Sequence, residues 1–278
     1  MPQDIVDDGH RDRLLIRRFP ALLHGLLPAD HLRRDGLEES EAAAAPISVD
    51  AEVLHALCTA DGLLELLDWS RCGVGADPLA CMWLGSLRWY RLVTGASPPQ
   101  APTPPPRDLD ASLETGLRSG ELTLRPGTGG LSRSGLATGE MAYPSAPAQA
   151  DAEDPDALIR VLPLALVPYV ELRMLHGWAD QTVCLTQGGD RLRRRAAVLV
   201  EELHHVAGAS ERTERVVTAL ARLGEIAEDG GYALRAVLSR VVTALDRALE
   251  GEVPREVTLH PRLRGFASAW RKITDDDR

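Results

Sequence analysis

The sequence is poor in aromatic residues, which make up only 4 % of its 278 positions. With so few large rings, the core has to be built mainly from Leu, Val and Ala. Such a core favours helices, because strands are enriched in β-branched and aromatic residues. No convincing run of alternating apolar and polar residues argues for a sheet. We therefore expect an all-α fold.

Lysine is almost missing as well: Lys272 is the only one, and every other basic residue is Arg. We attribute this bias to GC-rich, bacterial coding rather than to function. Acidic residues outnumber basic ones by 41 to 31, which gives a formal net charge of -10. Because an acidic surface repels phosphate backbones, we expect no general nucleic-acid binding.

The chain also lacks paired cysteine motifs and long apolar runs. None of its four Cys has C-x-x-C spacing, so buried free thiols in a reducing compartment are the simplest interpretation. The longest apolar stretch, residues 161–170, contains two prolines and is far shorter than the roughly 20 residues of a membrane span. The acidic start of the chain is unlike a signal peptide. We expect a cytoplasmic protein without membrane contacts.

What the sequence does contain is apolar residues at helical spacing. Ser48 is a candidate N-cap for the helix that follows it. Pro163 and Pro168 are expected to kink or split another helix. The predicted helices cover residues 11–27, 48–67, 78–93, 109–118, 131–139, 156–176, 190–206, 211–228, 231–250 and 261–273.

The remaining segments have the composition of loops. Residues 29–47 are polar and rich in Ala, and residues 144–155 are rich in Ala, Pro and Asp. Six prolines fall within residues 96–107, which predicts an extended, exposed connection. We interpret this segment as a surface loop rather than a domain boundary, and we assign residues 1–278 to a single domain.

Several motifs follow one another in a consistent order. Residues 48–52 read Ser-Val-Asp-Ala-Glu at the start of a predicted helix, and residues 125–130 read Arg-Pro-Gly-Thr-Gly-Gly. Residues 157–164 read Ala-Leu-Ile-Arg-Val-Leu-Pro-Leu, and Thr186 follows the next apolar segment. Over roughly residues 48–205, this arrangement resembles the ADP-ribosylglycohydrolase family.

The resemblance implies a single-domain, multi-helix orthogonal bundle with two Mg²⁺ ions in a cleft. Magnesium prefers carboxylate and hydroxyl oxygens, which several converging Asp and Thr residues supply in that family. Carried over to this sequence, Asp50 and Glu52 are the catalytic candidates, and Ser48 and Asp50 are the metal ligands. The implied ligand-binding residues are Gly127, Thr128, Gly129, Arg160 and Thr186.

The sequence departs from the family at the polar positions. Val49 and Ala51 replace two oxygen ligands of the first metal motif, so residues 48–52 are also consistent with an ordinary capped helix. Residues 152–156 (Ala-Glu-Asp-Pro-Asp) replace the glycines that would cradle phosphate. Both His residues expected after Thr186 are missing, and no C-terminal Asp-x-Asp-Thr cluster is found.

These departures predict an ADP-ribosylglycohydrolase-like protein that is catalytically inactive or altered. It would act by binding a protein partner or a nucleotide-like ligand, and it would hold no metal, with one Mg²⁺ at Ser48 and Asp50 as the alternative. The alternative function is an active metal-dependent hydrolase. Such an enzyme would release ADP-ribose from ADP-ribosylated protein or a small molecule.

Overall fold

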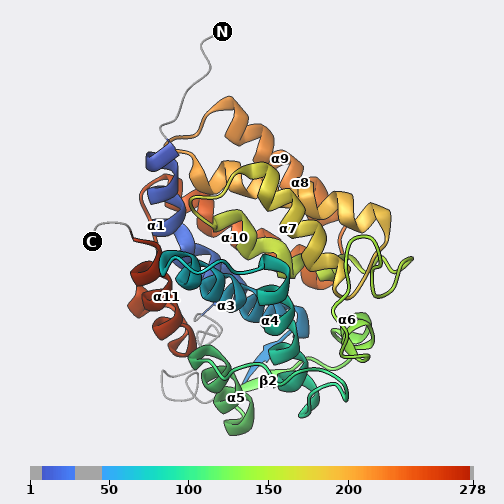
Figure 1. Ribbon diagram of the computed structural model, residues 1–278. Helices are drawn as coiled ribbons and strands as arrows, with labels where there is room; N and C mark the ends of the chain where they lie inside the picture. Colours follow the sequence, from blue (N-terminus) through green and yellow to red (C-terminus); the bar gives the residue numbers. More distant parts are fainter. Residues whose placement is uncertain (1–7, 29–45, 276–278) are drawn as a thin grey trace.

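The computed structural model describes residues 8–28 and 46–275, and most of these residues are helical (Figure 1). This confirms the all-α expectation in its main point. Figure 1 shows α7 (Leu172–Cys184), α8 (Asp190–Gly208) and α9 (Glu214–Glu228) at one end of the molecule and α5 (Asp108–Ser119) at the other. Within the described residues, the buried apolar side chains form one core cluster, as expected for a single domain.

Most of the remaining helices begin and end within a few residues of the predicted bounds. The α-helices are α1 (Asp8–Leu26), α3 (Ala51–Arg71), α4 (Pro78–Thr94), α6 (Gly130–Leu136), α10 (Tyr232–Leu249) and α11 (Pro261–Thr274). Two 3₁₀ helices, η2 (Pro155–Leu166) and η3 (Glu256–Thr258), complete the set that lies in the described chain.

Helix α3 lies at the centre of the fold, where it packs against α4 and η2. Its residues from Ala51 to Leu66 are all buried, polar ones included. Two glycines allow the close approach of α4. A Cβ atom on Gly62 would lie 2.6 Å from the carbonyl oxygen of Cys81, and one on Gly85 would lie 2.5 Å from that of Cys58. The two helices therefore touch backbone to backbone.

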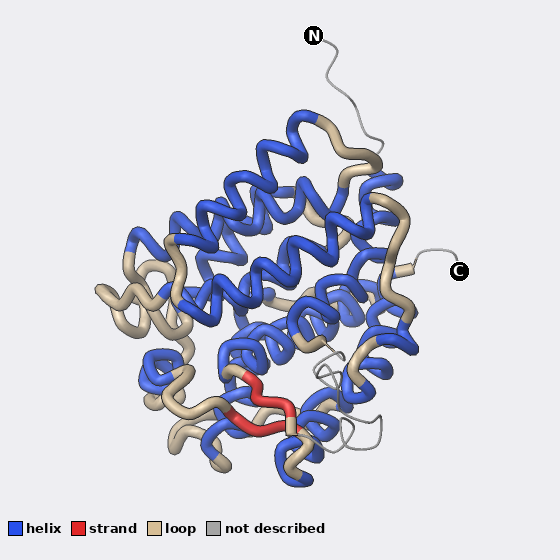
Figure 2. Tube along the Cα trace, turned by 180° about the vertical axis from the view of Figure 1, so that it is seen from behind, coloured by secondary structure: helices blue, strands red, loops and turns tan. Residues whose placement is uncertain are grey.

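A small parallel sheet corrects the expectation that no strands occur. Strand β1 (Ile47–Val49) pairs in register with β2 (Leu122–Leu124), shown in red in Figure 2. Each strand has only three residues, too few to produce a visible alternation of apolar and polar positions. The partners are also far apart in the sequence, so no hairpin signal marks them. The sheet brings the residues after Val49 next to those after Leu124.

The segment predicted as one kinked or split helix at 156–176 is in fact divided. Its first part is the 3₁₀ helix η2, not an α-helix, and α7 begins only at Leu172. The split expected at the prolines is thus confirmed, and the helix type is corrected. Residues 157–166 are all buried, so η2 forms part of the core.

The predicted loops agree with the structure where it describes them. Residues 96–107 contain no helix or strand and are mostly exposed, although Pro98 and Pro104 are buried. The expected loop at 29–47 lies almost entirely outside the described residues. Across the described ranges, no helix combines the length and the apolar character that a bilayer crossing requires.

Candidate functional site

Three helix starts from distant parts of the sequence meet at one place. They belong to α3, η2 and α10, and the turn that follows β2 lies against them. The side chains gathered there are Asp50, Glu52, Arg125, Asp154 and Asp156, which we call the candidate site. These side chains are close enough for their charges to interact, since the charges of Asp50, Glu52 and Asp154 all raise the pKa of Asp156.

The free N–H groups at the start of α3 are capped by side chains of the protein itself. Asp50 is the N-cap, and its Oδ1 accepts the backbone N–H of Glu52 at 2.9 Å. Thr128 Oγ1 accepts the N–H of Ala51 at 3.0 Å. The expected N-cap, Ser48, is exposed on β1 opposite Thr123, so the helix begins two residues later than that expectation required.

The turn after β2 supports this helix start. Thr128 also donates its hydroxyl to the carbonyl oxygen of Arg125 at 2.9 Å. Gly127 and Gly129 have φ values of 81° and 67°, in the left-handed region that favours glycine. A Cβ atom on Gly129 would lie 2.8 Å from that of Ala51. Three residues expected to bind a ligand therefore build the turn that holds α3.

Glu52 lies inside the protein, in a network of buried polar groups. Its Oε2 is 3.6 Å from Arg160 Nε and 3.5 Å from His55 Nδ1, and its Oε1 accepts a short hydrogen bond from the hydroxyl of Ser132. Burial alone would raise the pKa of Glu52, but Arg160, His55 and Ser132 together lower it. Glu52 is therefore a buried carboxylate anion paired with a guanidinium.

Arg160 and Thr186, both expected to bind a ligand, bond to each other in the same network. Arg160 donates from Nη1 to Thr186 Oγ1 at 2.6 Å and from Nη2 to Ser132 Oγ at 3.0 Å. Its Nε donates to the carbonyl oxygen of Ala157 at 3.0 Å. Both side chains are fully buried. These two residues, predicted to bind a ligand, thus lie together and contact protein groups.

His55 and Ser132 belong to this network and were missed in the sequence. The His55 ring stacks on Trp89 with centroids 4.1 Å apart, and its Nε2 hydrogen bonds to Ser86. Burial and the charge of Arg160 lower the pKa of His55 to about 4, so the ring is neutral near pH 7. One signal was available, because Glu52 and His55 are three residues apart and share a helix face.

Two of the three acids that replace the expected glycines also cap helix starts. Asp154 caps η2 by accepting the N–H of Asp156 at 3.0 Å. Asp156 crosses to another helix, where its Oδ1 accepts the N–H of Leu234 in the first turn of α10 at 2.8 Å. A Cβ atom on Gly231 would lie 2.5 Å from that same oxygen. A side chain at position 231 would therefore displace the Asp156 carboxylate.

Arg125 covers the exposed side of the site. Its Nη1 lies 3.7 Å from Asp50 Oδ2, and its guanidinium carbon lies 5.8 Å from the centre of the Tyr232 ring. Burial raises the pKa of Asp50, and the charges of Glu52 and Asp154 raise it further. The hydrogen bond from the Glu52 N–H and the charge of Arg125 oppose this shift without cancelling it. Asp50 is thus a nearly buried carboxyl group with a raised proton affinity.

Comparison with family models, with curated proteins and with solved structures finds no match to this chain. The properties of the site therefore rest on its own geometry. Within the described ranges, no three His, Cys, Asp or Glu side chains are grouped as a metal ion would require. Of the two expected metal ligands, Asp50 is occupied by an N–H group and Arg125, and Ser48 lies on β1. The donor set does not fit Mg²⁺.

Proposed function

We propose that this chain is an ADP-ribosylglycohydrolase-like binding protein that does not release ADP-ribose. The observation that carries the proposal is the role of the carboxylates at the helix starts. Backbone N–H groups at helix starts are the usual cradle for phosphate. Here Asp50, Asp154 and Asp156 accept hydrogen bonds from those groups. A pyrophosphate would have to displace fixed negative charges to bind in the same manner.

The arrangement of the acids also argues against activation of water by two metal ions. That chemistry needs several free carboxylates around a shared space. Glu52 is instead buried and paired with Arg160, and Asp50 caps α3 beside Arg125. Stripping either carboxylate of its partners would leave a buried group without compensation. A protein partner or a nucleotide-like ligand that contacts the exposed rim, at Arg125 and Tyr232, fits these constraints better.

The test is an assay of ADP-ribose release from an ADP-ribosylated protein in the presence of Mg²⁺. We expect no free ADP-ribose above the blank for the wild type. The matched variants are Asp50→Asn and Asp151→Asn, which remove the same charge from the site and from an exposed loop position. Release by the wild type and by Asp151→Asn that is lost in Asp50→Asn would overturn the proposal.

The second candidate is a working hydrolase, and one observation favours it. Burial and nearby carboxylates raise the pKa of Asp50. A carboxyl group of this kind can protonate a leaving group, as the general acids of glycosidases do. Under this alternative, activity would fall as the pH rises through the pKa of Asp50. The release assay above distinguishes the two functions.

A further inference from the structure

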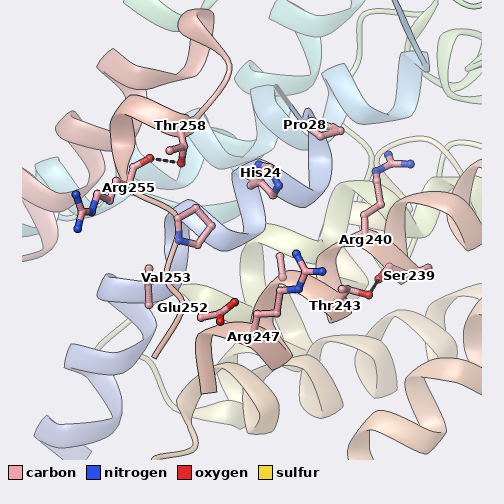
Figure 3. Close-up of a pocket in the computed structure, with 12 residues that line it drawn as sticks. His24, Pro28, Ser239, Arg240, Thr243, Arg247, Glu252, Val253, Arg255 and Thr258 are labelled. Atoms are coloured by element: carbon pink, nitrogen blue, oxygen red, sulfur yellow. Dashed lines mark hydrogen bonds between the residues drawn. The ribbon is translucent and has the colours of Figure 1, made fainter. Parts of the chain in front are cut away.

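A cavity lies between the end of α1 and the side of α10, next to the candidate site, since the charges of Arg125 and Tyr232 act on Arg240 in its lining. Its volume is about 620 Å³, within the range of roughly 300–1,000 Å³ that is usual for small-molecule sites. Residues 252–258, which follow α10, form its third wall (Figure 3). The two helices are fixed tightly, since a Cβ atom on Gly25 would lie 2.6 Å from the Cα atom of Val241.

The lining of this cavity is basic although the chain as a whole is acidic. Arg240, Arg247 and Arg255 border it, together with His24 and a single acid, Glu252. Within the described part of the chain, no carboxylate oxygen lies within 4.0 Å of these three guanidinium groups. Of the three, Arg240 is half-buried, and Arg247 and Arg255 are exposed.

Arg240, Arg247 and His24 lie around the space between α1 and α10. Arg240 Nε donates to the carbonyl oxygen of Gly25 at 3.0 Å, which fixes the side chain between the two helices. Figure 3 shows the Arg247 guanidinium in the space between α10 and the end of α1 that bears His24. His24 Nδ1 is shielded from solvent and has no hydrogen-bond partner in the described chain. Arg255 lies at the rim.

The other residues of the lining suit a carbon skeleton. Val253, Pro254 and Ala244 are apolar, and Pro28 adds a further apolar surface. The hydroxyl of Thr243 donates to the carbonyl oxygen of Ser239, one turn back on α10. Guanidinium groups therefore supply the hydrogen-bond donors that are free, and they match the oxygens of a phosphate better than any other side chain does.

We propose that this cavity binds a small phosphorylated metabolite. Its phosphate would lie between Arg240 and Arg247, within reach of His24, and its carbon skeleton would lie against Val253 and Pro254. The ligand would compensate the clustered positive charges that no carboxylate of the described chain offsets. This inference does not depend on the function proposed for the candidate site.

The test is isothermal titration calorimetry of the full chain with pyrophosphate and with AMP, and adenosine serves as the uncharged control. We expect saturable binding of a phosphorylated probe that weakens as the salt concentration rises, and no binding of adenosine. Arg247→Gln removes an exposed guanidinium and should weaken binding by about tenfold or more. Arg247→Lys, which keeps the charge, should weaken binding less.

The matched control is Arg194→Gln, which removes an exposed guanidinium from α8 and should leave the affinity unchanged. Asp151→Asn, at an exposed loop position, should also leave it unchanged. The proposal is overturned if neither phosphorylated probe binds at millimolar concentration. Equal losses of affinity in Arg247→Gln and Arg194→Gln would overturn it too, because they would indicate a general effect of charge.

Discussion

Asp110 shows at the scale of a single residue how burial changes a charge. It lies on α5 with 2 % of its surface exposed, and its Oδ1 is 3.6 Å from Arg88 Nε. Neither of its carboxylate oxygens has a hydrogen-bond partner in the described chain. Burial raises the pKa of Asp110 to about 6, with Asp61 adding to the shift against the opposing charges of Arg88 and Arg91.

The raised pKa predicts a pH-dependent stability. Because the folded chain holds the Asp110 proton more tightly than the unfolded chain, this stabilisation is complete below about pH 4 and is lost as the pH rises through about 6. The shift corresponds to about 3 kcal/mol. The wild type therefore loses about that much unfolding free energy between about pH 4 and pH 7, whereas Asn at position 110 has no proton to lose. The unfolding free energy of Asp110→Asn, measured relative to the wild type, should rise by the same amount over this range.

Urea unfolding at several pH values measures this difference. The matched control is Asp108→Asn, an exposed acid in the same first turn of α5. It removes the same charge from the surface of the helix. Parallel stability curves for Asp110→Asn and the wild type would show that the carboxyl of Asp110 titrates normally.

Residue types and their order in the sequence predict where polar groups gather, but not what they bind. Asp50, Thr128 and Arg160 are predicted site residues, and the structure brings all three together around the start of α3. Each of them contacts a protein group. Asp50 accepts the N–H of Glu52, Thr128 accepts the N–H of Ala51, and Arg160 pairs with the Glu52 carboxylate. The partners of Thr128 and Arg160 lie far away in the sequence, so no local pattern shows that these groups are satisfied internally.

At the scale of elements, the crossing of α3 and α4 depends on glycine. Gly85→Ala would place a methyl group 2.5 Å from the carbonyl oxygen of Cys58, a backbone atom that cannot rotate away. The overpacking should exceed the gain in helix propensity and lower the unfolding free energy by about 1–3 kcal/mol. Chemical denaturation of the purified variant measures the change.

The matched substitution is Gly177→Ala on α7, where no atom lies within 4 Å of the added Cβ. There the helix propensity acts alone, and we expect a gain of up to about 1 kcal/mol. If both variants gain stability, α3 and α4 can move apart without cost and the crossing does not need glycine.

The elements that the sequence predicted best are those with a one-sided apolar stripe. Helices α8 to α11 each bury one face, so the spacing of Leu, Val and Ala reveals them. Helix η2 is buried on every side, and its uniform apolar composition does not distinguish a 3₁₀ from an α-helix. The strands were missed because their pairing is not local.

At the scale of the whole molecule, the fold brings three helix starts together and neutralises each with its own acid. The start of α3 uses Asp50, that of η2 uses Asp154, and that of α10 uses Asp156 from η2. Carboxylates near helix starts are favourable because of the helix dipole. These acids therefore serve the stability of the fold, since each uses its Oδ1 to accept an N–H at a helix start.

This arrangement predicts how the chain responds to metal. A ligand that binds only the folded state at 100 times its Kd adds about 2.7 kcal/mol of stability, which raises the melting temperature by several degrees. Since no three acidic side chains of the described residues are grouped to hold Mg²⁺, we expect millimolar Mg²⁺ or its removal by EDTA to leave the melting temperature unchanged. Calorimetry at constant ionic strength, with NaCl as the control, makes the measurement. A rise with Mg²⁺ that disappears in Asp50→Asn but persists in Asp151→Asn would mean that Asp50 binds the ion, and the hydrolase alternative would then regain its metal.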